Sequence, residues 1–507
     1  MAQPTQGLSP VCPRASSACS TASRMNASSE LTRYGLAPEK ALASSHFAEQ
    51  ALQNETAMRL RSASLAAWLA MTVWGCRSSA PPVPPTRPAP AASRPGSAGL
   101  WLADSPDEAF EKARQSGKLV LADLWAPWCH TCLSMQAEVL RLEKVPELAS
   151  VVLLAIDTER ASNEAFLARY PVGVWPTFYL LDAKTQEVRG RWLGAATPAE
   201  LSGWLKEGAT ARPGYEQQLR EADSLVARRE LAAAEERYRG ALASAPQAWP
   251  GRGAALVSLV STLSKQKKDD ACLELALREL PLFPASVAAV DFAATSLGCA
   301  DRSASSENAS QLRAVAERSL ARDCGEAAPG AAVDDQADAC GNLRRVREVL
   351  KDDAGAAWAA EQALAVIAAG SAGGHPEKQA IYDWERTSSL LFLGRSAEAE
   401  AILRERENQL PQSYNPPHYL ARLYRDGKRW EDGLAAIERA LAKAYGPRRV
   451  GFLGIKADLL KGAGRLQEAR EVLEEQLAGY RALPPGQRQP DAEAAVQKRL
   501  EAWSTAP

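Results

Sequence analysis

The chain has 507 residues, and its 60 lysines and arginines nearly balance its 61 aspartates and glutamates, which gives a formal net charge of −1 at pH 7. This balance argues against nucleic acid or an acidic lipid surface as the main partner. The length suggests two or three domains after a Ser/Ala-rich beginning.

An apolar stretch near the N-terminus predicts export. Residues 58–76 read MRLRSASLAAWLAMTVWGC, in which two arginines precede a short apolar core. The core has a length typical of signal peptides, about 7–15 residues, and falls short of the about 20 residues that span a bilayer. The ending Val73-Trp74-Gly75-Cys76 resembles the lipobox of bacterial lipoproteins, and this resemblance implies lipidation of Cys76.

We therefore expect residues 58–75 to be a signal peptide, and the mature protein to face the periplasm as a lipid-anchored protein of the bacterial cell envelope. Arg77 and Ser78 lack the aspartate that signals inner-membrane retention in well-known lipoproteins, which favours the outer membrane. Residues 1–57 are then untranslated, with Met58 as the start, or a disordered extension. The alternative for the apolar stretch is an ordinary buried helix.

A linker follows the lipobox-like cysteine. Residues 76–99 are rich in proline, alanine and serine, a composition that cannot form a packed core and behaves as a semi-rigid spacer. Such a spacer would hold the next domain away from the membrane.

Two cysteines three residues apart, Cys129 and Cys132, follow a strand predicted over residues 118–125. Helical spacing begins at Cys129, where unpaired N–H groups and the helix dipole favour a thiolate. A thiolate attacks disulfides, and Cys132, one turn further along, is placed to resolve a mixed disulfide. The alternative is half of a structural zinc site, which needs a second pair of Cys or His ligands, and the sequence offers none at a useful spacing. The pattern therefore predicts a redox-active disulfide, with no metal and no cofactor.

Residues 100–208 resemble the thioredoxin family over more than the cysteine motif. The segment Gly173-Val174-Trp175-Pro176-Thr177-Phe178 is similar to the one that carries the family's cis-proline, which implies that Pro176 lies across from the cysteines and helps to hold a substrate. Asp123 falls where the family keeps a buried acid that accepts the proton of the resolving cysteine. Leu153 stands where many members carry a lysine near that acid.

The order of elements also fits this resemblance. Residues 151–157 and 177–182 are apolar runs expected of a covered sheet. Residues 105–108 and 197–200 each read as a helix-capping box with proline at the first helical position. The sequence around the cysteines is similar to that of the periplasmic domain of transmembrane thiol-reductant conductors. We therefore expect an α/β thioredoxin-like domain, a central mixed sheet with flanking helices.

Other residues around the cysteines are expected to bind substrate or to tune the dithiol. A protonated His130 would favour the Cys129 thiolate and make the disulfide more oxidising. Trp125 is expected in the core, and the bulk of Trp175 could restrict which substrates dock. The full expected set comprises Trp128, His130, Thr131, Trp175 and Pro176.

After Pro213 the composition turns to alanine, leucine, glutamate and arginine at helical spacing, and strand signals disappear. Residues 229–246 resemble the second helix of a tetratricopeptide repeat, and residues 394–403, 428–437 and 464–473 repeat the theme. Their aligned small residues are 34 and 36 positions apart, close to the period of about 34 for such repeats; they are Ala399, Gly433 and Ala469.

We therefore expect an all-α, tetratricopeptide-like helical repeat domain. It comprises an irregular region at residues 213–374, repeats at 375–483 and a C-terminal helix or tail at 484–507. Such arrays offer a concave surface for protein or peptide ligands. The alternative is a spacer or assembly surface.

Four cysteines of this helical part allow up to two disulfides, with free buried thiols as the alternative. Cys324 and Cys340 flank a loop rich in glycine, alanine and aspartate and are the preferred pair; the other two are Cys272 and Cys299. His375 and His418 lie in Gly/Pro-rich connections and are expected at the surface.

These patterns predict an exported, lipid-anchored thiol–disulfide oxidoreductase that acts on protein thiols and disulfides, with the helical repeats for partner binding. Its resemblance to reductant conductors favours reduction, with electrons from a membrane thiol carrier, whereas His130 favours oxidation. One alternative is a membrane-tethered scaffold or redox sensor in which the repeats are the functional part. A peroxidase-like use of the fold would need a cysteine in a different sequence setting.

Overall fold

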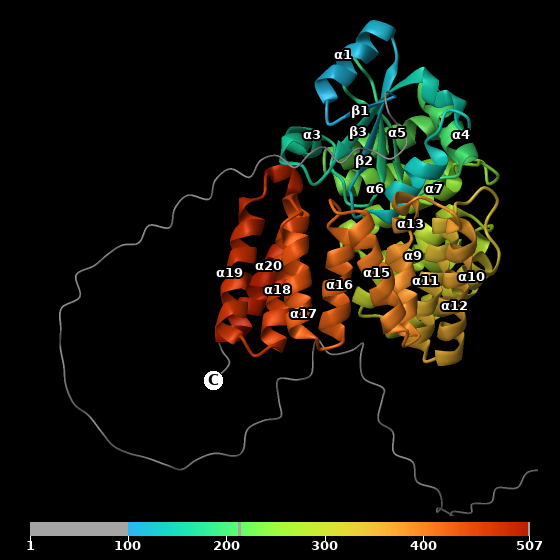
Figure 1. Cartoon of the computed structure of the whole chain (residues 1–507). Coiled ribbons are helices and arrows are strands. Elements are labelled where there is room, and N and C mark those ends of the chain that lie inside the picture. The colour runs from blue at the N-terminus through green and yellow to red at the C-terminus, as the bar shows by residue number, and fades with distance from the viewer. Residues whose placement is uncertain (1–99, 211–213, 505–507) are drawn as a thin grey trace, which may run out of the picture. The chain divides into compact units, whose positions relative to one another are not determined.

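The computed structural model describes residues 100–210 and 214–504, and its elements are shown in chain order in Figure 1. The predicted signal peptide, Cys76 and the linker lie outside the described residues. Within the described part, no helix combines the length and the apolar character that crossing a bilayer requires.

Five strands form one mixed sheet in the order β1-β3-β2-β4-β5. Strands β1, β3 and β2 run parallel, and β4 and β5 are antiparallel to their neighbours. The central strands are continuous apolar runs because helices cover both faces of the sheet. The strands are β1 (Trp101–Ala103), β2 (Leu119–Trp125), β3 (Val151–Asp157), β4 (Thr177–Leu181) and β5 (Val188–Leu193).

The predicted strands are confirmed as β2, β3 and β4, whereas β1 and β5 were not predicted. Helices pack on the sheet to make two apolar clusters, one around Phe110, Leu154 and Tyr179 and one around Met135 and Leu201. The helical segments of this part are α1 (Pro106–Ser116), α2 (His130–Ser134), η1 (Met135–Val139), η2 (Pro146–Ser150), η3 (Ala161–Asn163), α3 (Glu164–Arg169) and α4 (Pro198–Ala209).

One of the two predicted capping boxes is present. The Thr197 hydroxyl accepts a hydrogen bond from the Glu200 backbone, and the Glu200 carboxylate accepts one from Thr197, so α4 begins as predicted. The prediction for Ser105 is wrong: its hydroxyl donates to the carbonyl of Ala103 at 2.8 Å and makes no cap bond to α1. Asp104, the residue before Ser105, has a positive φ of 51° and turns the chain ahead of α1.

The described residues after 213 form helices only. They are α5 (Tyr215–Ala227), α6 (Leu231–Ser244), α7 (Arg252–Lys265), α8 (Asp269–Glu279), η4 (Leu280–Leu282), α9 (Val287–Arg302), α10 (Ser306–Gly325), α11 (Val333–Leu350), α12 (Asp353–Ser371), α13 (Pro376–Ala380), α14 (Asp383–Phe392), α15 (Ser396–Gln409), α16 (Asn415–Asp426), α17 (Trp430–Leu441), α18 (Gly446–Gly462), α19 (Leu466–Ala482), η5 (Pro485–Gln487) and α20 (Pro490–Ser504). We call residues 214–504 the helical region.

The three predicted repeat segments begin helices α15, α17 and α19, as expected. Their aligned small residues are buried between helices, because consecutive helices pack closely at these positions. A methyl group on Gly433 would lie 2.4 Å from a side-chain carbon of Leu459 on α18. The small residues therefore permit the close helix pairing on which the region depends.

The structure corrects one expectation and resolves another. His418 is not at the surface: it is 3% exposed and stacks on Phe452 with 4.5 Å between ring centroids. The Asn-Pro-Pro sequence before it begins α16 rather than an exposed connection, because proline is favoured in the first turn of a helix. Cys324 forms the preferred disulfide with Cys340. A further disulfide joins Cys272 and Cys299, on the adjacent helices α8 and α9.

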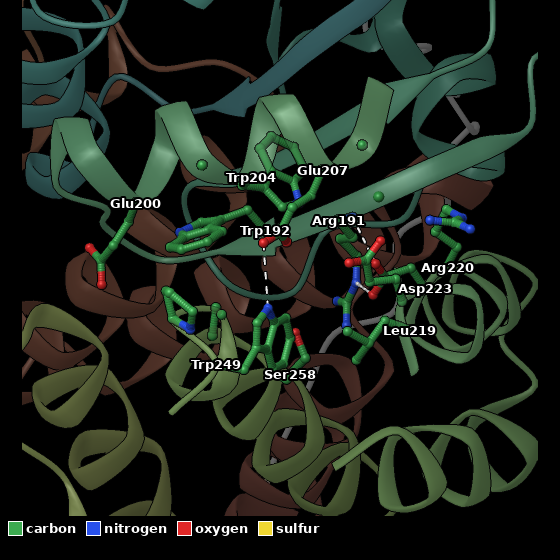
Figure 2. A pocket seen from close by; sticks show the side chains of 18 of the residues that line it. Arg191, Trp192, Glu200, Trp204, Glu207, Leu219, Arg220, Asp223, Trp249 and Ser258 are labelled. Carbon is green, nitrogen blue, oxygen red and sulfur yellow. Dashed lines mark hydrogen bonds and ion pairs between the residues drawn. The ribbon is translucent and has the colours of Figure 1, made fainter. Parts of the chain in front are cut away.

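A buried polar network joins the helical region to the sheet beside β5 (Figure 2). The guanidinium of Arg191 donates to the Tyr238 hydroxyl at 3.0 Å, and that hydroxyl donates to Asp223 at 2.5 Å. Asp223 also accepts the backbone N–H of Arg191. A small cavity of about 120 Å³ lies next to this network, between the sheet and helices α4, α5 and α7. The network fixes α5 and α6 against the sheet because breaking it would strand buried charge.

Replacing both Cys324 and Cys340 with serine should lower the free energy of unfolding of the helical region by about 2–4 kcal/mol, because the bond closes a 16-residue loop and restricts the unfolded chain. The check is the denaturant midpoint followed by circular dichroism, with an intact Cys272–Cys299 bond verified by mass. An unchanged midpoint would contradict a stabilising role.

Candidate functional site

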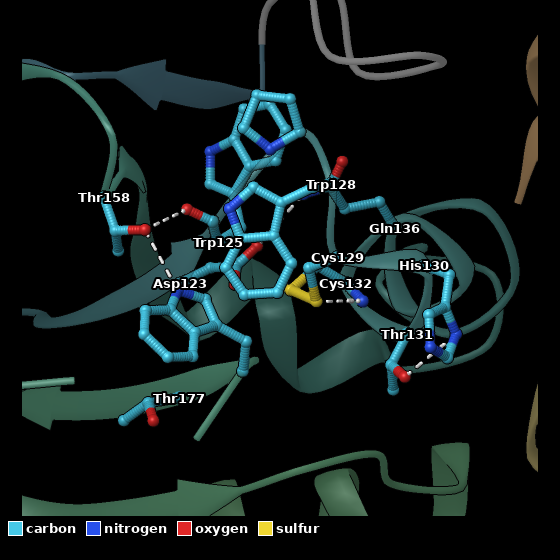
Figure 3. The surroundings of a disulfide bond; sticks show 12 residues. Asp123, Trp125, Trp128, Cys129, His130, Thr131, Cys132, Gln136, Thr158 and Thr177 are labelled. Carbon is cyan, nitrogen blue, oxygen red and sulfur yellow. Dashed lines mark hydrogen bonds between the residues drawn. A yellow bond between two sulfur atoms is a disulfide. The ribbon is translucent and has the colours of Figure 1, made fainter. Parts of the chain in front are cut away.

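The two motif cysteines are joined by a disulfide between the end of β2 and the first turn of α2 (Figure 3). Strand β2 ends at Trp125, and a turn closed by a bond from the Cys129 N–H to the Ala126 carbonyl leads to the helix. Cys129 has extended backbone angles and is the N-cap of α2, and its sulfur accepts the Cys132 N–H at 3.0 Å. The local sequence thus places the Cys129 sulfur over the first turn of a helix, where N–H groups face it.

A cis peptide bond lies next to the disulfide. The Trp175–Pro176 bond is cis, as the resemblance implied. The indole of Trp175 packs on that of Trp128, with 5.1 Å between ring centroids, and donates to the Thr158 hydroxyl at 3.0 Å. Both tryptophans and both cysteines belong to one apolar cluster. The motif and the cis-proline loop, 44 residues apart in the chain, therefore meet as expected.

Asp123 lies inside the sheet near the cysteine pair (Figure 3). It is buried on β2, between Ala155 of β3 and Phe178 of β4 in the sheet register. Its carboxylate accepts a hydrogen bond of 3.5 Å from the side-chain amide of Gln136 on η1. Leu153, the departure from the family's frequent lysine noted in the sequence, is buried on β3. A neutral amide therefore contacts this acid.

The helical region covers the motif. The side-chain amide of Asn415, at the start of α16, donates to the Pro127 carbonyl at 2.8 Å. The guanidinium of Arg448 on α18 lies 5.0 Å from the centroid of the Trp128 ring. Cys129 is 4% exposed and Cys132 1% exposed, in an apolar cluster made by residues of the thioredoxin-like part itself. The dithiol site is buried within the whole chain.

The end of β3 and the residues after it make further polar contacts with the helical region. The Tyr445 hydroxyl donates to Asp157 at 2.5 Å, and the side-chain amide of Gln487 donates to the Thr158 carbonyl at 2.8 Å. Glu159 accepts two bonds, from the Trp128 indole at 2.8 Å and from the Arg448 backbone N–H at 2.6 Å. Glu159 thus ties the tryptophan beside the cysteines to α18.

A glycine allows this close approach. Gly446 begins α18 at φ 57°, and a methyl group on it would lie 2.0 Å from the Glu159 carbonyl oxygen. A side chain at this position would push α18 away from the loop after β3. The contact between α18 and that loop therefore requires glycine.

Two carboxyl groups of this contact are less acidic than usual. Burial raises the pKa of Asp157 to about 6, although the hydrogen bond from Tyr445 opposes the shift. Burial raises the pKa of Glu159 to about 7, opposed by the bonds from Trp128 and Arg448. In both cases the pKa is raised because the end of β3 and the loop after it are buried.

His130 is held by acids of the helical region. Its Nδ1 lies 3.2 Å from both carboxylate oxygens of Asp334 and 3.8 Å from an oxygen of Asp338, both on α11. The candidate ligand atoms of these three residues lie within 4.8 Å of one another, a spacing that a metal ion can use. The neighbouring acids raise the pKa of His130 to about 10 against the effect of burial. A protonated imidazole has no lone pair at Nδ1, so we assign the group as an ion pair.

A cavity of about 760 Å³ opens beside the motif helix. The thioredoxin-like part lines it with Trp125, Pro127 and Leu133, and the helical region with Pro416 and Tyr419. The lining is mixed, with apolar residues such as Leu133 and charged residues such as Glu143 and Glu377. Leu133 is the residue of α2 that lines this cavity.

The structure brings together most of the site residues proposed from sequence. Trp128, Cys129, Cys132, Trp175 and the cis Pro176 are adjacent, while His130 and Thr131 face α11 on the other side of the disulfide. The residues that sequence reasoning missed come from the helical region and from the loop after β3; they are Glu159, Asp334, Asp338, Asn415, Tyr445 and Arg448. The cluster of aspartates at the start of α11 was the one visible signal.

Comparisons with known proteins agree with this geometry for the first part of the chain. Residues 106–209 match the model of the thioredoxin-like domain. The chain is 32% identical over 83 residues to protein disulfide-isomerase 1 of Dictyostelium discoideum, covering 16% of this chain and 23% of that protein. It is 37% identical over 95 residues to thioredoxin C-3 of Corynebacterium nephridii, covering 19% of this chain and 61% of that protein. The chain thus spans less than two thirds of the length of either relative.

Two solved structures are similar to more than half of the chain. One is a tetratricopeptide repeat protein from Parabacteroides merdae, at 15% identity and a TM-score of 0.38, covering 57% of this chain and 97% of that one. The other is the apo form of RapI, at 16% identity and a TM-score of 0.36, covering 53% and 97%. Together, the matched residues, the five-stranded sheet, the cysteine pair and the cis-proline show that residues 106–209 form a thioredoxin-like domain.

Proposed function

We propose that this protein catalyses thiol–disulfide exchange through Cys129 and Cys132. The observation that carries the proposal is the disulfide at the strand–helix junction of a thioredoxin-like domain, adjacent to a cis-proline. The sulfur of Cys129 faces the first turn of α2, which stabilises a thiolate when the pair is reduced. Protein thiols and disulfides are the proposed substrates.

The exchange takes two steps in the reducing direction. The Cys129 thiolate attacks one sulfur of the substrate disulfide; a mixed disulfide forms and the other substrate sulfur leaves as a thiolate that takes up a proton. Asp123 accepts the proton of the Cys132 thiol, through a water or directly. The Cys132 thiolate then attacks the Cys129 sulfur, which releases the second substrate thiol and transfers two electrons in all. The reverse sequence oxidises a substrate dithiol.

We propose reduction as the physiological direction, with electrons supplied by a membrane thiol carrier. The support is the sequence resemblance to the periplasmic domain of reductant conductors. Reduction also needs continuous re-reduction of Cys129 and Cys132 in an oxidising compartment, which a membrane donor would supply.

We further propose that the protein is exported and anchored by lipid at Cys76, facing the periplasm from the outer membrane. Residues 58–76 support export by their signal-peptide pattern. The Cys272–Cys299 and Cys324–Cys340 disulfides support it independently, because such bonds persist in oxidising compartments and are rare in the cytosol.

The helical region is proposed to select substrates. It contacts the redox face of its own chain through Asn415, Tyr445 and Arg448. A folded protein substrate meets the helical region next to the dithiol, whereas an extended segment can enter the cavity beside α2. Protein or peptide ligands of the helices would bias this arrangement.

The second candidate function is a tethered scaffold or redox sensor. In it the helical region binds the partner and the dithiol only senses the redox state. The burial of Cys129 favours it. A sensor changes state once per redox event, whereas an oxidoreductase turns over. Multiple turnovers with a dithiol reductant and a peptide disulfide therefore decide between the two.

Replacing Cys129 with serine should reduce the exchange rate to that of the uncatalysed reaction, because no nucleophile remains at the α2 N-cap. Replacing Cys132 should instead trap one substrate per chain as a mixed disulfide, seen by mass. Ser116→Ala, at an exposed site on α1 of the same domain, is the control. Retained turnover in Cys129→Ser would contradict the mechanism.

Replacing Trp175 with alanine should widen the substrate range, since its indole fills the space between the cis-proline and Trp128. The measurement is kcat/KM over peptide disulfides with flanking residues of increasing size, and bulky flanks should gain most. Trp175→Phe, which keeps an aromatic ring against Trp128, should stay close to the wild type. Equal ratios across the panel in all three proteins would refute the idea.

A further inference from the structure

His130 lies between the two cysteines in sequence, but acids of another part of the chain hold its ring. Asp334, buried near the start of α11, offers both oxygens at 3.2 Å from Nδ1. Asp338, one turn further along α11, reaches the same atom at 3.8 Å. The two acids are 204 and 208 positions from His130, so only the folded contact between α2 and α11 brings them together.

Figure 3 shows the imidazole beside Thr131, on the side of the disulfide away from Trp128. The Thr131 hydroxyl lies 3.4 Å from Nδ1 and adds a weak polar contact. The ring is therefore turned toward α11. An imidazole that is free to rotate would sample positions closer to the Cys129 sulfur.

The titratable and charged groups around His130 come from three helices. Asp334 and Asp338 of α11 and Glu385 of α14 attract the imidazolium, and the last is also held by the Ser389 hydroxyl. Arg345 of α11 lies near Asp338 and Glu385 and offsets part of their charge, as Arg344 does for Glu385. Burial and neighbouring acids raise the pKa of Asp291 on α9 to about 8 and that of Asp335 on α11 well above its usual range, so these two carboxyls keep their protons near neutral pH and add little charge.

The sum of these contacts keeps the ring charged. Burial by itself would lower the pKa of His130, but Asp338 and Asp334 outweigh it and raise the pKa to about 10. An ordinary histidine loses its proton near pH 6.5. At pH 7 to 8, His130 is therefore an imidazolium paired with carboxylates rather than a neutral ring.

We propose that Asp334 and Asp338 are positioning residues of the redox site: from the helical region they hold His130 charged and directed away from Cys129, and so set the reactivity and reduction potential of the cysteine pair. This inference rests on the proposed exchange function. Its physical basis is that a nearby cation stabilises the Cys129 thiolate, while paired carboxylates weaken that effect.

The ion pair of His130 with the two aspartates determines how the reactivity of Cys129 changes with pH. With Asp334 and Asp338 in place, His130 keeps its proton through the neutral range, so the charge on this ring is constant there. Burial raises the pKa of Asp338 to about 7, although His130 opposes the shift, so this carboxyl takes up a proton as the pH falls through that value. With asparagine at both positions, His130 should lose its proton as pH rises through about 6.5. Below that pH an unpaired imidazolium would stabilise the thiolate and make the pair more oxidising; above it the effect would disappear.

The test uses the full chain with Asp334→Asn and Asp338→Asn together. Ring signals of His130 are followed by NMR from pH 5.5 to 8.5, which is feasible because the chain has four histidines. The pH profile of Cys129 alkylation and the potential against glutathione are measured on the same proteins. The wild-type ring should not titrate in this range, whereas the double variant should titrate and show a matching inflection in Cys129 reactivity.

Asp335→Asn is the matched control, because Asp335 is buried on the same helix and accepts the Ala332 N–H at 2.8 Å rather than contacting His130. It should leave the ring and the potential unchanged. If the double variant does not fold, Asp338→Asn alone, at a partly exposed site, should shift the titration in the same direction by a smaller amount.

A wild-type His130 that titrates near pH 6.5, or a double variant with the wild-type titration and potential, would overturn the inference. The NMR result does not depend on activity. If the double variant shows the shifted titration but the wild-type protein has no exchange activity, the proposed function is contradicted while the ion pair of His130 stands.

Discussion

The contact between the helical region and the redox face is the constraint on which the rest of the structure depends. The contact is polar: Glu159, Asp157 and His130 are each paired with a group of the helical region. Taking such groups out of water is unfavourable unless their partners are in place, so the contact is specific rather than merely adhesive. It packs Arg448 on Trp128, ties Asn415 to the carbonyl of Pro127 and directs His130 toward α11. Access to the dithiol and its electrostatic environment therefore depend on the same interface.

Each side of the contact is positioned by apolar packing that does not involve the other. The sheet and its helices bring Cys129 and the cis Pro176 together, as residues 106–209 of a thioredoxin-like domain. Close helix pairing, with small residues such as Gly433 at the crossings, sets the direction of α16 and α18. Two disulfides brace the middle helices. Rigid neighbours of this kind can hold a few polar groups in register across an interface.

Sequence reasoning worked where the signal is local. Continuous apolar runs predicted β2, β3 and β4, and the proline before Thr177 suited a cis bond. Strand β5 was missed because Arg189 and Arg191 interrupt it, and the second is buried only because Asp223 of α5 neutralises it. The whole cover of the redox site was missed for a similar reason. Its pairs join residues some 200 to 330 positions apart, which no period or motif connects.

The most direct test of the covered site is the alkylation rate of Cys129 in the selectively reduced full chain, with the modified peptide identified by mass. Gly446→Ala should accelerate the reaction severalfold, because its methyl group would strike the Glu159 carbonyl and move α18 off the site. Gly464→Ala is matched in backbone strain, at φ 76°, but its methyl group would meet open space, so it should react like the wild type. Equal rates in all three proteins, or a wild-type rate equal to that of a free thiol, would contradict the claim that the helical region covers the dithiol.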